Sequence, residues 1–182
     1  MFTRDKPLGK IIVNDSVISG QGSFATRDIT KGEFITILKG RPVRQHEYPV
    51  ICKELQLTND DPLQIQTDLF LILEPSSKAI NHSCEPNVCI REESSVYAKR
   101  DIRKNEEITY DYSTTVGLNE DWKMKCCCGS KQCRNEIGNI GTIPRPVLDR
   151  YLKENALPRF ILMEHVDRLQ PVVVYGNFKW GR

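Results

Sequence analysis

Four short stretches of the sequence carry residues whose types and spacing suit a chemical function. They are a glycine-rich stretch at Ser19–Phe24, a polar stretch at Asn81–Cys84, a tyrosine pair in Tyr110–Tyr112 and a cysteine cluster at Cys126–Cys133. Each of them also has an ordinary structural explanation, because short motifs occur by chance. Their interpretation therefore depends on all four taken together.

The first two stretches point to ligand binding, but only weakly when each stands alone. Gly20 and Gly22 lie one residue apart, and glycine lets a backbone approach a ligand closely or adopt a positive φ. A plain turn between strands explains the same pair. The polar groups of Asn81 and His82 could likewise satisfy the backbone of a turn. That explanation leaves Cys84 without a role.

The tyrosine pair follows an alternating run that begins at Asn105. In a strand, residues two apart share a face, so we expect Tyr110 and Tyr112 to lie on the same side. Tyrosines are common in strands as packed core residues with satisfied hydroxyls. The pair by itself does not separate catalysis from packing.

The cysteine cluster has the spacing C-x-C-x4-C at Cys126, Cys128 and Cys133. Three thiolates leave a tetrahedral zinc ion one ligand short, and structural zinc sites are normally closed. We predict Cys84 as the fourth ligand. Cys127 is the local alternative, disfavoured because side chains of adjacent residues point apart. A reduced cluster without metal is the other alternative, although thiols so close together invite oxidation.

The elements that must position these residues are mostly short strands. Between Lys10 and Tyr112, apolar runs are broken by turn residues, and the turn-like stretches 28–32 and 101–105 resemble each other. Residues 40–68 look like a less regular insertion with a short helix. Two helices are predicted at Pro146–Glu154 and Pro158–Leu169, and Val172–Tyr175 is strand-like.

The composition excludes several classes of protein. The 182 residues include 26 Lys and Arg against 24 Asp and Glu, a net charge of +2, so nucleic acid is not an expected partner. Apolar runs are too short to cross a bilayer, so we expect no membrane association. The N-terminal residues lack the features of a secretory signal. With the clustered cysteines, this predicts a reducing intracellular compartment.

In this order, the four stretches resemble the SET-domain protein lysine methyltransferases with a post-SET zinc segment. Gly20-Gln21-Gly22 is similar to that family's cofactor-binding glycine motif, and Asn81-His82-Ser83-Cys84 matches its Asn-His-Ser-Cys motif. The run 107–112 matches the strand with the catalytic tyrosine, and the three spaced cysteines match the post-SET triad. The resemblance covers about residues 10 to 140.

The resemblance implies a mainly β fold with some α structure. It would contain several small sheets, a knot-like crossing of the Asn81 and Tyr112 segments, a post-SET zinc segment and a helical C-terminal appendage. The implied domains are a SET catalytic domain at 1–113 with a variable insertion at 40–68, a zinc segment at 114–140 and a helical extension at 141–182.

The resemblance also implies roles for individual residues. Tyr112 and Tyr110 would be catalytic, and a tyrosine rather than a phenylalanine at position 110 favours mono- or dimethylation. S-adenosylmethionine would be the cosubstrate and Zn²⁺ a structural ion. The implied cofactor-binding residues are Gly20, Gln21, Gly22, Phe24, Asn81, His82 and Tyr112. The implied zinc ligands are Cys84, Cys126, Cys128 and Cys133.

The implied partner is a lysine of a protein or peptide, with histones among the candidates. The expected compartment is the nucleus or cytoplasm, and a bacterial effector secreted into a host cell also fits. The chain has Lys78-Ala79 where many members have Arg-Phe, and the stretch before residue 10 is too short for a pre-SET module, so we expect none there. The alternative is therefore a SET-like zinc-containing peptide-binding module with weak catalysis. A purely structural zinc protein is a third possibility.

Overall fold

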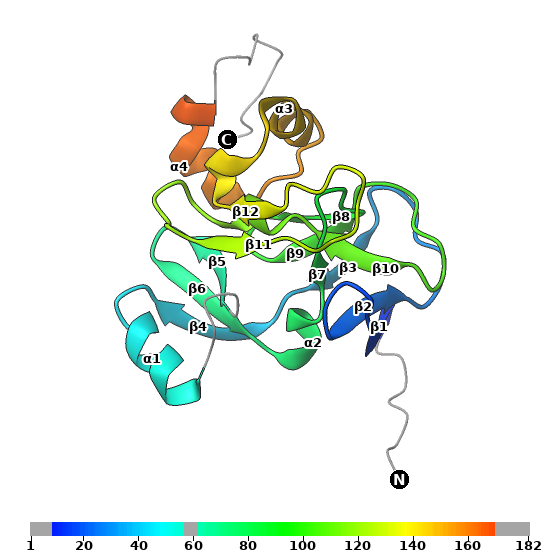
Figure 1. The fold of residues 1–182 in the computed structure, drawn as a ribbon, viewed down its shortest axis with the longest axis horizontal. Helices are drawn as coiled ribbons and strands as arrows, with labels where there is room; N and C mark the ends of the chain where they lie inside the picture. The colour runs from blue at the N-terminus through cyan, green and yellow to red at the C-terminus, as the bar shows by residue number, and fades with distance from the viewer. Residues whose placement is uncertain (1–8, 57–61, 170–182) are drawn as a thin grey trace, which may run out of the picture.

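The computed structural model of the chain describes residues 9–56 and 62–169, with side chains described as far as residue 164. Within these residues the chain forms four small β-sheets and a few short helices (Figure 1). The prediction of a mainly β fold with some α structure is confirmed. No helix in the described part of the chain is long and apolar enough to cross a membrane.

The largest sheet joins three of the four chemical stretches. Its strand order is β1 (Ile11–Asp15), β2 (Gln21–Ala25), β10 (Glu107–Tyr110) and β7 (Asn81–His82). β10 pairs antiparallel with β2 and parallel with β7, so Thr109 faces Asn81 and Tyr110 faces His82. The glycine, asparagine and tyrosine stretches therefore lie side by side. The predicted crossing of the asparagine and tyrosine segments requires this contact between them.

Two three-stranded sheets and a hairpin complete the β structure. One sheet has the order β3 (Phe34–Ile37), β9 (Ser95–Ala98), β8 (Val88–Arg91). The other has the order β4 (Gly40–Arg44), β6 (Leu69–Leu73), β5 (Pro62–Gln66). The hairpin joins β11 (Lys123–Lys125) to β12 (Glu136–Gly138), on either side of most of the cysteine cluster.

The insertion is more regular than the sequence predicts. The expected helix is present as α1 (Tyr48–Leu55), but strands β4 and β5 flank it where we predicted irregular structure. Both strands contain a proline, Pro42 and Pro62, which argues against a strand inside a sheet. Proline is tolerated here because each strand lies at an edge of its sheet, paired only with β6.

The two similar turns are confirmed, and they hold each other. Asp28 Oδ1 accepts from the Lys104 N–H, and Asp101 Oδ1 accepts from the Lys31 N–H, each at 2.8 Å. Between them, Ile29 and Ile102 pair their backbones. The likeness of the two sequences thus reflects a reciprocal contact, in which each turn caps the other.

The remaining helical elements are short. They are α2 (Pro75–Lys78), the 3₁₀ turns η1 (Tyr112–Thr115) and η2 (Ile140–Thr142), α3 (Arg145–Lys153) and α4 (Arg159–Leu169). Both predicted C-terminal helices are therefore confirmed. They lie together at the end of the molecule opposite α1 (Figure 1). The strand-like run 172–175 lies outside the described residues.

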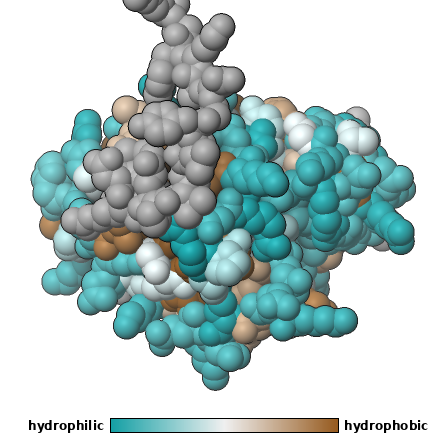
Figure 2. All heavy atoms as spheres, turned by 90° about the horizontal axis from the view of Figure 1, so that it is seen from above, coloured by the Kyte–Doolittle hydropathy of each residue, from teal (hydrophilic) through white to brown (hydrophobic). Residues whose placement is uncertain are grey.

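The C-terminal helices bury an apolar cluster against the sheet of β8 and β9. Leu148, Tyr151, Leu157 and Ile161 are buried there with Cys89 of β8. Where it is not covered by grey atoms, the face seen from this end is mostly hydrophilic, with small separate hydrophobic areas (Figure 2). Burial of this cluster thus gives the helical extension a fixed place on the sheet of β8 and β9.

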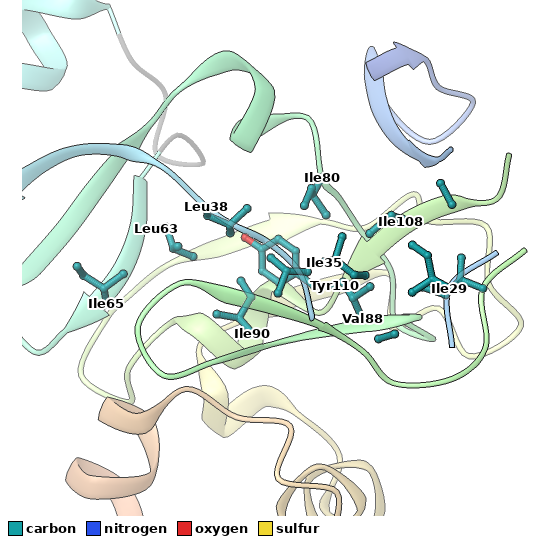
Figure 3. Packing of buried hydrophobic residues seen from close by; sticks show 14 residues of the cluster. Ile29, Ile35, Leu38, Leu63, Ile65, Ile80, Val88, Ile90, Ile108 and Tyr110 are labelled. Carbon is teal, nitrogen blue, oxygen red and sulfur yellow. The ribbon is translucent and has the colours of Figure 1, made fainter. Parts of the chain in front are cut away.

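The main core is aliphatic apart from one aromatic ring. Ile35, Ile80, Val88 and Ile108 are among its buried residues, and Tyr110 is the tyrosine buried with them (Figure 3). The predicted strand through Tyr112 is wrong in one respect, because β10 ends at Tyr110. Asp111 caps the following turn by accepting from the Ser113 N–H, so the chain turns there instead of continuing extended.

Candidate functional site

A cavity of about 340 Å³ opens beside the tyrosine pair. Its walls come from the insertion, from η1 and from the loop before β11. Aromatic side chains dominate the lining, and polar groups such as Gln64, Glu120 and Asp121 lie among them. The aromatic lining residues are Tyr48, Phe70, Tyr110, Tyr112 and Trp122. Small-molecule and side-chain pockets commonly have this mixture of apolar walls and few polar groups.

Tyr112 is held in place by several contacts. Its hydroxyl donates to the Ile80 carbonyl at 2.9 Å, and its N–H donates to His82 Nδ1 at 3.2 Å. Its ring lies 4.7 Å from the Tyr110 ring, centroid to centroid. The two tyrosines therefore meet as expected, although a turn rather than a continuous strand brings them together.

Tyr110 is buried and stays protonated at neutral pH. Burial raises the pKa of its hydroxyl well above the usual value, and the nearby Tyr112 acts in the same direction, while a hydrogen bond with Thr115 opposes them. A neutral phenol in this place is a hydrogen-bonding group and a steric limit rather than a base.

The asparagine motif is tied to the glycine stretch. Asn81 Nδ2 donates to the Ser19 and Gln21 carbonyls at 3.2 and 3.0 Å, and to Glu107 Oε1 at 2.8 Å. Since the amide nitrogen takes these acceptors, the direction of the amide oxygen is set as well. Gly20 directly precedes β2 and has φ +44°, a conformation that glycine adopts without strain.

Position 22 must be a glycine because side chains of the protein itself occupy the space where a Cβ would lie. A Cβ at this position would lie 2.8 Å from Glu107 Cδ and 2.9 Å from Ser16 Cβ. Glu107 uses that space to accept from Asn81 and from the Ser16 hydroxyl, the latter at 2.8 and 2.9 Å. The sequence analysis missed Glu107 and Ser16, because nothing in their spacing shows this contact.

Apart from Tyr112, the predicted cofactor residues are not among those that line the cavity. Ser23 and Ala25 of β2 are fully buried, so alternation places Gly22 and Phe24 on the opposite face. Phe24 is half-buried there and is the β-sheet partner of Glu107. Ile80 lines the cavity, whereas the next residue, Asn81, bonds to the glycine stretch. Ile80 and Asn81 thus connect the cavity to the glycine stretch.

Four predicted metal ligands gather at one point. Cys84 Sγ lies 3.8 Å from Cys126 Sγ, which lies 3.6 Å from Cys133 Sγ. Cys128 Sγ is 3.5 Å from the Cys84 N–H group that donates to it. Zinc–thiolate bonds of about 2.3 Å place the sulfurs of a tetrahedral site about 3.8 Å apart. The donor set and the two printed sulfur separations therefore suit a zinc ion, and Cys127 points outward as an exposed thiol.

His82 is a rival for Cys133 as the fourth ligand. The ligand atoms of His82, Cys84, Cys126 and Cys128 all lie within 4.8 Å of one another. However, His82 Nδ1 accepts from the Tyr112 N–H, so a neutral ring carries its proton on Nε2, which lies 3.3 Å from Cys84 Sγ. A protonated nitrogen donates a hydrogen bond to a thiolate and does not bind metal. The hydrogen bonds of His82 thus count against it as a ligand, whereas the compact group of donor atoms contains His82 and leaves out Cys133.

The protonation of these groups follows from burial and hydrogen bonds. Burial lowers the pKa of His82 to about 4, against the opposing charge of Asp111, which keeps the ring neutral. Burial opposes ionisation of Cys128, but hydrogen bonds from Cys84 N–H and Ser130 lower its pKa to about 6. Burial raises the pKa of Cys126. One thiolate is thus available at neutral pH to begin metal binding.

Asp111 and Arg134 were also missed by the sequence analysis. Asp111 is almost fully buried between the two tyrosines, and Arg134 follows the last ligand. They form an ion pair of 2.5 Å between Arg134 Nη2 and Asp111 Oδ1. The sequence did contain a signal for this ion pair. A charged residue at the buried end of a strand needs a partner of opposite charge.

Comparisons with known proteins agree with this geometry. The sequence model of the SET domain family matches residues 20–113. Histone-lysine N-methyltransferase trr of Drosophila melanogaster is 31% identical over 132 residues, which cover 65% of this chain and 5% of that protein. Histone-lysine N-methyltransferase SETD1B of Homo sapiens is 32% identical over 139 residues, covering 67% and 7%.

Among solved structures, ctPRC2 in an autoinhibited conformation bound to S-adenosylmethionine is similar with a TM-score of 0.52. The identity is 20%, and the match covers 59% of this chain and 15% of that one, so the likeness concerns the fold. The chain spans less than a tenth of the length of either relative described above.

Proposed function

The chain belongs to the SET-domain family, and on that basis we propose that it transfers methyl groups from S-adenosylmethionine to lysine side chains of a protein. The observation that carries the proposal is the position of Tyr112. Its hydroxyl lies at the boundary between the aromatic cavity and the strand pair that holds Asn81 beside the glycine stretch.

The cavity is suited to hold a lysine side chain in its reactive form. A free lysine has a pKa of about 10.4 and is protonated at neutral pH, so it is not a nucleophile. Desolvation by the aromatic walls disfavours the ammonium form, and the sulfonium charge of the methyl donor acts in the same direction. No strong general base is required, and Tyr110 and Tyr112 contribute phenols to the cavity wall.

Tyr112 would orient the reacting groups. A hydroxyl that donates to the Ile80 carbonyl keeps acceptor capacity toward an amine N–H or an activated methyl group. The Ile80 carbonyl is a second oxygen at the same place. Transfer depends on alignment of the amine with the methyl carbon, so a fixed pair of oxygens contributes through positioning.

The cosubstrate would lie on the other side, against Gly20–Phe24, Asn81 and His82. Supporting this, the amide of Asn81 is oriented by three acceptors, and Phe24 is half-buried on the same face as Gly22. S-adenosylmethionine supplies the electrophilic methyl group when bound. The protein's own residues orient its amino-acid end and exclude water.

We further propose that Cys84, Cys126, Cys128 and Cys133 hold a structural zinc ion. The separations between their sulfur atoms support this set. Such an ion would supply no chemistry to the transfer. It would fix the segment 114–140 against the catalytic core at 1–113, with 141–182 as an extension.

The proposed substrate is a lysine in a histone or another basic protein. The relatives bear histone-lysine methyltransferase names, and Glu120 and Asp121 place acidic groups at the cavity. The neutral Tyr110 hydroxyl takes up space in the cavity, which favours mono- and dimethyl products. The reduced zinc cluster fits a reducing compartment such as the nucleus or cytoplasm.

The test is transfer of tritiated methyl groups onto histones and whole-cell extract. Tyr112→Phe should lower the rate by about a hundredfold, the usual effect of removing one preorganised hydrogen-bonding group from a reaction centre. Tyr97→Phe, outside the cavity, is the matched control and should transfer at the wild-type rate. Equal rates for Tyr112→Phe and wild type would refute the role of Tyr112. Cosubstrate binding without transfer to any protein would support the weakly catalytic binding module instead.

A further inference from the structure

Asp111 is the meeting point of three separate parts of the chain. Its side chain is 1% exposed. Oδ1 accepts from the Ser113 N–H of its own turn at 3.1 Å and from Arg134 Nη2 of the zinc segment at 2.5 Å. Oδ2 accepts from the Tyr151 hydroxyl of α3 at 3.2 Å. Asp111 directly precedes Tyr112 and directly follows Tyr110.

Arg134 connects Asp111 to the cysteine cluster. Its Nε and its backbone N–H both point to Cys84 Sγ, at 3.3 and 3.4 Å. The guanidinium therefore lies between a proposed zinc ligand and the buried carboxylate. Because a guanidinium is planar and rigid, the position of one contact constrains the other.

Tyr151 connects Asp111 to the C-terminal extension. It is 1% exposed and belongs to the buried cluster of α3 and α4. The Lys99 ammonium lies 4.0 Å from the centre of its ring. Burial raises the pKa of its hydroxyl, and the Asp111 charge does the same, so this group acts as a donor.

A buried carboxylate is stable only when its oxygens are matched by donors. Here the donors fix the carboxylate, and the carboxylate fixes the start of η1 by capping the Ser113 N–H. Tyr112 is the first residue of that turn. Displacement of the carboxylate therefore moves the backbone that carries the Tyr112 hydroxyl.

We propose that Arg134 and Tyr151 are positioning residues for the transfer reaction, acting on Tyr112 through Asp111. The C-terminal helical extension is then part of the catalytic apparatus, because α3 supplies one of the donors that place the catalytic turn. This inference rests on the proposed methyl transfer. It assigns a function to the segment for which the sequence indicated only helices.

The test is Tyr151→Phe, which removes one hydroxyl and keeps the ring packed under Lys99. We expect kcat to fall about tenfold to a hundredfold, as small misplacements of reacting groups do. KM for the peptide and cosubstrate affinity should stay near wild type, while Tm falls because Asp111 Oδ2 loses a buried hydrogen bond. Tyr97→Phe is the control, because Tyr97 packs against the same cluster. A purely structural role would lower Tm and leave kcat unchanged, which would overturn the proposal.

A second readout separates this inference from the proposed function. The protein has six tyrosines, and fluorotyrosine labelling gives each a ¹⁹F signal, with that of Tyr112 identified by its loss in Tyr112→Phe. Tyr151→Phe and Arg134→Lys should both shift the Tyr112 signal, and Tyr97→Phe should not. If the wild type transfers no methyl group while the shift is present, the proposed function fails and the positioning contact stands. An unchanged signal with an unchanged kcat refutes the positioning role.

Discussion

The substitution Gly22→Ala tests why the glycine motif needs its second glycine. A Cβ at this position would lie too close to Glu107, at 2.8 Å from Cδ, and 2.9 Å from Ser16 Cβ. The carboxylate is the end of a flexible side chain, so it can swing away without disrupting the sheet. We therefore expect the folded protein to survive with impaired cosubstrate binding.

The magnitude follows from the hydrogen bonds that the swing removes. Glu107 Oε1 would lose the Asn81 amide at 2.8 Å and the Ser16 hydroxyl at 2.8 Å. A hydrogen bond to a charged group contributes about 1.5–3 kcal/mol. If the orientation of Asn81 depends on this bond, affinity for the cosubstrate should fall roughly tenfold to a hundredfold.

The assay is calorimetric titration with S-adenosylmethionine, combined with Tm, in a double-mutant cycle with Glu107→Ala. All variants of this cycle carry Ser16→Gly, which removes the second close contact of the added Cβ. Each single variant should lose affinity, and Gly22→Ala/Glu107→Ala should lose no more than Glu107→Ala alone, because both clashes are then gone. Gly20→Ala is the control. It meets open space at φ +44° and should be strained whether or not Glu107 is present. A further tenfold loss from Gly22→Ala in the Glu107→Ala background would show that the ligand itself needs the glycine and would refute the reasoning.

Four more outcomes are expected. Tyr110→Phe should raise the share of trimethyl product, measured by mass spectrometry, and rapid trimethylation by the wild type would contradict this. Cys133→Ser should lose the zinc measured by atomic absorption, whereas the neighbouring Cys127→Ser should keep it; the reverse result would change the ligand set. Glu120→Gln should raise KM for a basic peptide about fivefold, because a partly exposed charge pair contributes about 1 kcal/mol. The difference in KM between this variant and the wild type should shrink at high salt. Hydrogen bonds from Arg27 and Lys10 lower the pKa of Glu33 to about 2, so Glu33→Gln should be less stable than wild type in urea above about pH 4.5, with the difference closing as the pH falls toward 2.

The sequence was sufficient for most of the strands and for the C-terminal helices. The run 69–73 and the run 88–91 are apolar enough to be recognised as strands, and both are strands in the structure. Strands β4 and β5 were not recognised, because Pro42 and Pro62 are acceptable only at sheet edges. Edge position is a property of the assembled sheet, so no local pattern reports it.

By itself, then, the sequence determined which residue types are present for the proposed transfer and the zinc site. Phenols, an amide, glycines and spaced thiols have properties that do not depend on the fold. Only the tertiary structure decided how they act together. Parallel pairing of β7 with β10 places Asn81 against Glu107, 26 residues away, and packing of α3 brings the Tyr151 hydroxyl to Asp111, 40 residues away. These contacts join segments that only burial of the whole core brings close in space. The space beside Gly22 is therefore used by Glu107. Asp111 likewise connects the zinc segment, the helices and Tyr112.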